Sequence, residues 1–254
     1  MTVLNSKYPA LVVDQVSKKY GAVQALNNLC FEAHAGEIVG LLGDNGAGKS
    51  TIIKCISGMI AFNSGNIIIN GKKFNKLTPT QSRKLGIETI YQELAVVDQL
   101  DVVGNIFLNR EIKHNNFILN FFKIMDSNKM YAKSKELLNQ LNVKIPSIKM
   151  KLGQLSGGQR QIVAIARAIA WGSEIILMDE PAAALGVEQS KQVLNLINEL
   201  KKNNICVIFI SHNLQHVQAV CDRTVILRHG VKVADLKLNQ TNKNEIVEYI
   251  TGVN

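Results

Sequence analysis

Short runs of apolar residues separated by amphipathic stretches predict an α/β fold. In the second half of the chain, such runs stand at residues 174–179, 205–210 and 224–227. Uninterrupted apolar runs of this length are typical of strands that are buried on both faces of a parallel sheet. A fourth run, at residues 37–42, leads directly into a glycine-rich segment. The pattern therefore predicts a mixed or parallel sheet with helices between its strands.

The N-terminal third of the chain predicts antiparallel strands. One strand is expected at residues 10–16, and the apolar run at residues 67–69 is followed by Asn70-Gly71, a pair that favours a two-residue hairpin turn. Thr78 stands before Pro79 and three residues before Gln81, which predicts a helix that begins at Pro79 with Thr78 as its N-cap. We therefore expect an antiparallel β subdomain at the N-terminal end.

The sequence changes character after about residue 92. Aromatic and apolar clusters alternate there with helical patterns such as residues 128–141, and strand patterns return after residue 170. We therefore expect a single domain over residues 1–254. Its core would comprise residues 1–92 and 171–254, with an inserted helical subdomain at about residues 93–170.

The composition is that of a globular protein. Of the 254 residues, 46% are hydrophobic and 19% are charged, which excludes a disordered chain. No apolar run approaches the roughly 18 residues of a membrane span. We also expect no signal peptide, and hence a cytoplasmic protein. The four cysteines lack metal-ligand spacing, and we expect them to be buried thiols.

The net charge of +9 raises the hypothesis of a nucleic-acid or anionic-lipid partner. The lysines, however, are spread along the chain and often stand beside asparagines, as at residues 201–204 and 242–244. The sequence has no clusters of arginine interleaved with aromatic residues, which single-strand-binding proteins use. The charge pattern therefore favours a solvated basic surface and no nucleic-acid partner.

The segment between the strand predicted at residues 37–42 and the helix predicted at residues 49–56 fills the template G-x-x-x-x-G-K-[ST] at every fixed position. Glycines allow successive N–H groups to curl around a polyphosphate, and the helix N-terminus adds partial positive charge. Lys49 is placed to reach the β- and γ-phosphates, and Ser50 to ligate Mg²⁺. A glycine-rich turn that binds nothing is the alternative, but the strand-loop-helix context favours a nucleotide site. The residues expected to bind the nucleotide here are Gly43, Asp44, Asn45, Gly46, Ala47, Gly48, Lys49, Ser50 and Thr51.

Two further motifs carry candidate chemistry. The apolar run at residues 174–179 ends in Asp179-Glu180, where Asp179 can hold Mg²⁺ through water and Glu180 can act as a general base towards an attacking water. Ser156-Gly157-Gly158-Gln159 predicts the N-terminus of a second helix, capped by Ser156, with exposed N–H groups that make a second anion site. Alone, each motif fits an ordinary strand end or capped helix; together with the phosphate loop they point to a nucleotide hydrolase.

With these three motifs in order, the chain resembles the ATP-binding cassette ATPases over nearly its whole length. The resemblance implies a P-loop NTPase core that binds ATP and Mg²⁺. It implies that Tyr20 stacks on adenine, that Gln92 senses Mg²⁺ and the attacking water, and that His212 contacts the γ-phosphate. Without the resemblance, Tyr20 fits a core tyrosine and His212 a structural hydrogen-bonding residue.

The resemblance also implies partners. In this family two modules pack head to tail, so that Ser156, Gly158 and Gln159 of one copy close over the γ-phosphate held by Lys49 of the other. A membrane permease would dock near Gln92, in the groove between the core and helical subdomains, on the cytoplasmic face of the membrane. Catalysis would be phosphoryl transfer to water, mainly by positioning and charge stabilisation.

The segment after Glu180 departs from the common family pattern. Ala182 stands where most members carry a hydroxyl residue, and Gly186 where they carry an aspartate that helps the two copies communicate. The sequence of residues 183–187 is similar to that of the family branch that imports simple sugars such as ribose, xylose or fructose. In that branch a sugar-binding protein delivers the cargo. The alternatives are a transporter ATPase for another cargo, such as an amino acid or a lipid, a soluble cassette ATPase acting on nucleic acid or ribosomes, and a nucleotide-binding regulator without hydrolysis.

Overall fold

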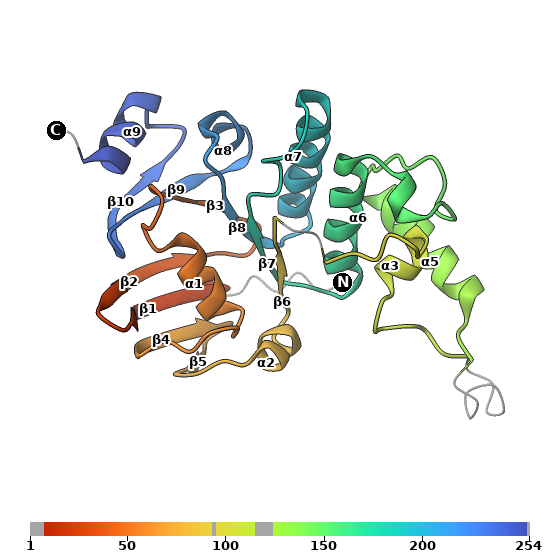
Figure 1. Cartoon of the computed structure of the whole chain (residues 1–254), viewed down its shortest axis with the longest axis horizontal. Helices are drawn as coiled ribbons and strands as arrows, with labels where there is room; N and C mark the ends of the chain where they lie inside the picture. Colours follow the sequence, from red (N-terminus) through yellow and green to blue (C-terminus); the bar gives the residue numbers. More distant parts are fainter. Residues whose placement is uncertain (1–7, 93–94, 115–123, 253–254) are drawn as a thin grey trace. The chain divides into compact units, whose positions relative to one another are not determined.

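The computed structural model describes residues 8–92, 95–114 and 124–252 (Figure 1). Their contacts divide them into two compact units. The core unit contains residues 8–92, 173–183 and 197–252 of the described chain, and the helical unit contains residues 95–114, 124–172 and 184–196. We describe each unit by itself.

The larger sheet of the core unit has six strands in the order β10-β9-β3-β8-β7-β6. The strands from β9 to β6 run parallel, and β10 is antiparallel to β9. Because parallel strands end at the same edge of a sheet, the residues that follow β3, β8, β7 and β6 gather there. The strands are β3 (Ile38–Leu42), β6 (Ile87–Ile90), β7 (Ile175–Asp179), β8 (Cys206–Ile210), β9 (Arg223–Arg228) and β10 (Val231–Lys237).

The second sheet of the core unit is antiparallel, with four strands in the order β2-β1-β4-β5. They are β1 (Leu11–Tyr20), β2 (Val23–Ala33), β4 (Ser64–Ile69) and β5 (Lys72–Phe74). Asn70 and Gly71 join β4 to β5 and have φ values of 48° and 78°, as a tight two-residue hairpin turn with both central residues left-handed requires. The antiparallel subdomain and the hairpin at Asn70-Gly71 are therefore confirmed.

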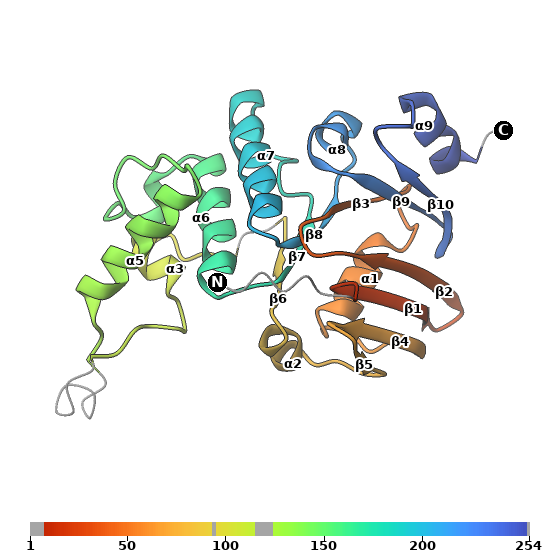
Figure 2. The ribbon, with the colours of Figure 1, turned by 180° about the vertical axis from the view of Figure 1, so that it is seen from behind.

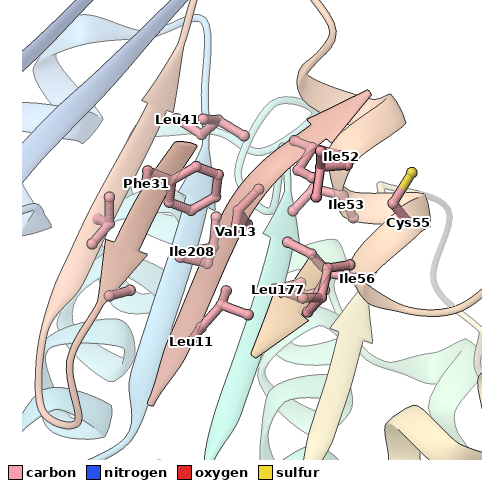
Figure 3. Packing of buried hydrophobic residues seen from close by; sticks show 14 of the residues in the cluster. Leu11, Val13, Phe31, Leu41, Ile52, Ile53, Cys55, Ile56, Leu177 and Ile208 are labelled. Atoms are coloured by element: carbon pink, nitrogen blue, oxygen red, sulfur yellow. The ribbon is translucent and has the colours of Figure 1, made fainter. Parts of the chain in front are cut away.

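Helix α1 (Lys49–Ile56) shares one hydrophobic core with both sheets. In Figures 1 and 2 it lies beside β1, and Figure 3 shows its buried side chains among those of the strands. The labelled members of this cluster are Leu11, Val13 and Phe31 from the antiparallel sheet, Leu41, Leu177 and Ile208 from the six-stranded sheet, and Ile52, Ile53, Cys55 and Ile56 from α1. The start of α1 is thereby anchored relative to the end of β3.

The remaining helices of the core unit are α2 (Pro79–Lys84), α8 (Leu214–Val220) and α9 (Lys243–Thr251). Thr78 caps α2 with Pro79 in its first turn and Gln81 completing a capping box, as predicted. The helical unit holds α3 (Val102–Ile106), α5 (Ser127–Gln140), the 3₁₀ turn Leu152–Gln154 and α6 (Gly157–Ala170). In the described ranges, none of the helices combines the length and the apolar character that a bilayer span requires.

Helix α7 (Val187–Lys202) begins in the helical unit and continues into the core unit. We expected all of residues 171–254 in the core, whereas residues 184–196 belong to the helical unit. The reason is local packing: a Cβ added to Gly157 would lie 3.2 Å from Leu185 Cδ2, and one added to Gly158 would lie 2.8 Å from Gln189 Cβ. The first turn of α7 is thus packed directly on the start of α6.

We predict that Ile53→Ala lowers the free energy of unfolding by about 2–5 kcal/mol, because it leaves a cavity in the core that the two sheets share with α1. Ile53 is fully buried within that cluster. Urea denaturation measures the loss. The exposed Val247→Ala in α9 is the matched control and should change stability by less than about 0.5 kcal/mol. Equal effects of the two substitutions would contradict this packing.

Candidate functional site

The loop between β3 and α1 depends on glycines that lie against neighbouring backbone. Gly43 has φ +145°, and a Cβ added there would lie 2.2 Å from the carbonyl oxygen of Leu227. Gly48 has φ +105°, and its added Cβ would lie 2.7 Å from the carbonyl oxygen of Ala25. Other residues would be strained at these φ values and would collide with atoms that cannot move aside. The loop therefore takes the tight curl that the motif predicts.

The N-terminus of α1 faces this loop without a side-chain cap. Gly48 is the N-cap residue and supplies no side-chain acceptor for the first N–H groups of the helix. These N–H groups and the positive end of the helix dipole favour a bound anion. Ser50 is exposed in this first turn, and Thr51 beside it is half-buried.

Lys49 places a buried ammonium group at the same point. The residue is 7% exposed, and its Nζ donates hydrogen bonds to the carbonyl oxygens of Gly43 at 2.8 Å and Asp44 at 2.9 Å. Burial lowers the pKa of Lys49, while the charges of Glu180, Asp179 and Asp44 oppose that shift. Because its hydrogen-bond partners are neutral carbonyls, the ammonium charge is free to pair with a phosphate.

The end of β7 brings two carboxylates, those of Asp179 and Glu180, close to this ammonium. Asp179 pairs with Ile210 of β8, which in turn pairs with Leu41 of β3, so about 10 Å separate the ends of β3 and β7. The next residue, Glu180, donates its N–H to the Ile210 carbonyl at 3.1 Å and has φ +53°. Non-glycine residues are rare in this left-handed region, and such strained positions cluster at functional sites.

The Glu180 side chain is poised to accept a proton. It is 12% exposed, and its Oε1 lies 3.3 Å from Nε2 of His212, whose side chain is 56% exposed. This contact lacks hydrogen-bond geometry, so Oε1 is a buried acceptor without a hydrogen-bond partner. Burial raises the pKa of Glu180 above its ordinary value; the charge and backbone N–H of His212 partly oppose this rise. A buried, unsatisfied carboxylate oxygen is suited to hold and deprotonate a water.

Two other predicted residues also lie in the core unit. Gln92 is exposed and follows β6, the strand that pairs with β7, so it stands at the same edge of the sheet as Asp179. Tyr20 is 46% exposed at the end of β1, with Nζ of Lys18 at 5.0 Å from its ring centre. The half-exposed ring makes it available for stacking on a base.

The described residues contain no group of three or more His, Cys, Asp or Glu side chains placed to hold a metal ion. Mg²⁺ bound to a nucleotide needs fewer protein ligands, since phosphate oxygens and water complete its octahedron. Hard oxygen donors suited to it are available from the Ser50 hydroxyl, the Asp179 carboxylate and the Gln92 amide. The chemistry of this donor set therefore fits the ion.

The residues of the second predicted anion site lie at the start of α6, in the helical unit. Oγ of Ser156 accepts the N–H of Gln159 at 3.3 Å, and Oε1 of Gln159 accepts the N–H of Ser156 at 3.0 Å. This capping box makes Ser156 the N-cap of α6, as predicted, and Gly158 is buried behind it. Ser156, Gly158 and Gln159 thus lie together in the helical unit, and the other predicted residues lie in the core unit.

Gly230 was not predicted as a site residue. It lies in the turn between β9 and β10 and is hydrogen-bonded to the phosphate loop. Its N–H donates to the carbonyl of Ala47 at 3.1 Å, and its carbonyl accepts the N–H of Asn27 at 2.9 Å. Its φ is +80°, and an added Cβ would lie 2.7 Å from the Ala25 carbonyl oxygen. The available signal was a glycine between two apolar strand patterns, typical of a hairpin turn.

Comparison with known proteins places these motifs in context. The model of the ABC transporter family matches residues 26–183. A xylose/arabinose import ATP-binding protein of Sulfolobus acidocaldarius is 45% identical over 95% of this chain and 94% of its own length. A fructose import ATP-binding protein of Rhizobium meliloti is 40% identical over 96% and 94%. A ribose import ATP-binding protein of Bacillus subtilis is 33% identical over 93% of this chain, which spans 47% of that protein.

Solved structures support the same fold. A nucleotide-free ATP-binding cassette from an ABC transporter has a TM-score of 0.80 and 26% identity, with 96% of both chains covered. A dimeric cassette in a post-hydrolysis state bound to ADP and phosphate has a TM-score of 0.73 and 26% identity, with 90% of this chain and 98% of that chain covered. The predicted α/β fold with a P-loop core is therefore confirmed.

We predict that Gly43→Ala destabilises the protein by about 3 kcal/mol or more, since its Cβ would meet the Leu227 carbonyl oxygen as well as an unfavourable φ. Gly46→Ala is the matched control in the same loop. Gly46 has φ +79° but no atom within 4 Å of an added Cβ, so only the left-handed cost of about 1–2 kcal/mol applies. Urea denaturation of both variants compares the two losses. A larger loss for Gly46→Ala would contradict the loop geometry.

We predict that Glu180→Gln raises the melting temperature at pH 7.5. Because the folded state raises the pKa of Glu180, folding takes up protons between the unfolded and folded pKa values, and stability falls as pH rises through this window. The amide removes this penalty. The difference between variant and wild type should shrink as pH falls and vanish below about pH 4, near the unfolded pKa. Melting curves at several pH values, with the exposed Glu248→Gln as control, measure it; a variant less stable at neutral pH would contradict the shift.

Proposed function

Because this chain belongs to the ABC transporter family, we propose that it is the ATP-hydrolysing subunit of an importer that takes up a monosaccharide through a membrane permease. The observation that carries the hydrolytic part is the Glu180 carboxylate, whose buried Oε1 accepts no hydrogen bond and whose charge interacts with that of Lys49. The cargo is inferred from the xylose/arabinose and fructose import ATP-binding proteins, which align over nearly their whole length.

In the proposed reaction, ATP and water give ADP and phosphate. The N–H groups of the loop from Gly43 to Gly48, together with Lys49, Ser50 and Thr51, bind the phosphates, and Tyr20 stacks on adenine. Glu180 accepts a proton as the water oxygen attacks the γ-phosphorus and the bond to the β–γ bridging oxygen breaks. His212 and Gln92 orient the γ-phosphate and the water. Mg²⁺, held by Ser50, Gln92 and Asp179, would neutralise the developing charge on the phosphates.

The proposed assembly contains two copies of this chain or of a related module. Ser156, Gly158 and Gln159 of one copy would contact the γ-phosphate bound to the other. The dimeric cassette among the solved structures supports the pairing of two copies. We propose that the core and helical parts work as one ATPase domain, that a permease contacts it near Gln92 on the inner face of the membrane, and that a separate sugar-binding protein delivers the cargo. No nucleic acid takes part.

We predict that Lys49→Ala lowers ATP turnover by about 100-fold or more, because it removes the buried ammonium that pairs with the β- and γ-phosphates. Lys54→Ala is the matched control, since Lys54 is exposed in the same helix and should leave turnover close to wild type. Phosphate release from the purified proteins measures both. Undiminished turnover in Lys49→Ala would contradict the assignment.

The same pair of variants tests the cargo in cells. A strain deleted for this gene should lose uptake of one or more of radiolabelled xylose, arabinose, fructose and ribose, and the wild-type gene or Lys54→Ala should restore it. Lys49→Ala should not. Normal uptake of all four sugars with loss of amino-acid or lipid transport would overturn the sugar assignment and leave the ATPase assignment intact.

A further inference from the structure

The two glycines at the start of α6 stand where no unusual backbone conformation requires glycine. Gly157 and Gly158 are the first residues of α6, and neither has a positive φ. Alanine at a helical position is more favourable than glycine. The helix therefore loses stability by having glycine here, and something outside its own backbone must account for it.

The segment that approaches Gly158 is the first turn of α7. A Cβ added to Gly158 would lie 2.8 Å from Gln189 Cβ, 3.2 Å from Cγ and 3.4 Å from Cα. Real Cβ atoms do not approach other carbon atoms so closely, and Gln189 Cβ cannot turn away because the backbone fixes its position. Gly157 differs, because its added Cβ would meet only side-chain ends, Leu185 Cδ2 at 3.2 Å and Gln189 Oε1 at 4.0 Å.

The start of α7 is itself held in place. The N–H of Ser190 donates to the Gly186 carbonyl at 2.9 Å, and its hydroxyl donates to the Leu185 carbonyl at 3.4 Å. Ser190 is buried, whereas Gly186 is exposed and has free space around it. The backbone on both sides of Gln189 is thus fixed by hydrogen bonds, and α6 must fit against it.

We propose that Gln189 is a positioning residue that sets the angle at which the start of α6 presents its N–H groups. The proposal rests on the proposed function, since it concerns the edge that would close on the nucleotide of a second copy. Gln189 itself does not touch the phosphate. Its Cβ and Cγ fill the space over Gly158, so that the capped turn of Ser156 and Gln159 has one orientation. The need for glycine at position 158 therefore comes from Gln189 and not from the approach of phosphate.

If Gln189 is the reason for glycine at position 158, a second substitution at Gln189 should restore the activity that Gly158→Ala loses. Gly158→Ala should lower kcat for ATP by about 100-fold, because the added methyl group displaces the start of α6 by a fraction of an ångström or more. The double variant Gly158→Ala/Gln189→Gly removes the opposing Cβ and leaves the added methyl 3.4 Å from Cα of residue 189. Its kcat should return to within about threefold of Gln189→Gly alone.

A matched control separates packing from helix flexibility. Gln192 is exposed one turn further along α7, and Gln192→Gly carries the same intrinsic helix cost. Gly158→Ala/Gln192→Gly should remain as inactive as Gly158→Ala. In all variants, binding of a fluorescent ATP analogue to monomeric protein should stay within about twofold of wild type, since the phosphate loop is untouched. Melting curves show whether each variant is folded.

The outcomes are distinct. Recovery in the Gln189 double variant and not in the Gln192 one supports the proposal. A folded double variant that binds the analogue and stays as slow as Gly158→Ala overturns it, because glycine is then needed only for the approach of phosphate. Full activity of Gly158→Ala also overturns it. Absence of ATP turnover in the wild-type protein would instead refute the proposed function, because each comparison of kcat between variants requires ATP turnover.

Discussion

The close approach of the phosphate loop to neighbouring backbone is the constraint on which the site depends. Gly43 lies against the Leu227 carbonyl and Gly48 against the Ala25 carbonyl, so the loop is held between the end of β9 and the start of β2. Gly230 adds a hydrogen bond to Ala47 from the turn after β9. The loop therefore has its conformation before any phosphate binds, which would lower the ordering cost of binding.

The charged side chains beside this loop explain which reaction the site is suited to. A buried ammonium is costly unless it is hydrogen-bonded, and Lys49 is satisfied by two loop carbonyls. Asp179 and Glu180 lie near enough to oppose the lowering of its pKa. Glu180 has the reverse problem, because burial disfavours its negative charge and leaves Oε1 without a hydrogen bond. A phosphate beside Lys49 would balance the buried ammonium charge, and a water beside Glu180 would donate the hydrogen bond that Oε1 lacks. These groups are therefore suited to phosphoryl transfer to water.

Features that depend on neighbouring residues could be predicted from the sequence. The strand-loop-helix at residues 37–56, the turn at Asn70-Gly71 and the caps at Thr78 and Ser156 all follow from local rules, and the structure has each of them. Contacts between distant segments could not be predicted. The positive φ of Glu180, the hydrogen bond of Gly230 and the packing of Gln189 on Gly158 depend on segments that meet only after folding. The roles of individual site residues remain predictions.

In the proposed dimer, each chain would hold half of an ATP site, which a second copy would complete through Ser156, Gly158 and Gln159. Light scattering tests this by giving the mass of Glu180→Gln in solution with and without ATP and Mg²⁺. With hydrolysis slowed, ATP should convert the 28.0 kDa monomer to a species of twice that mass, and adding Ser156→Arg should prevent the change. A Glu180→Gln protein that binds ATP yet keeps the monomer mass at all concentrations tested would show that two copies do not share the ATP site.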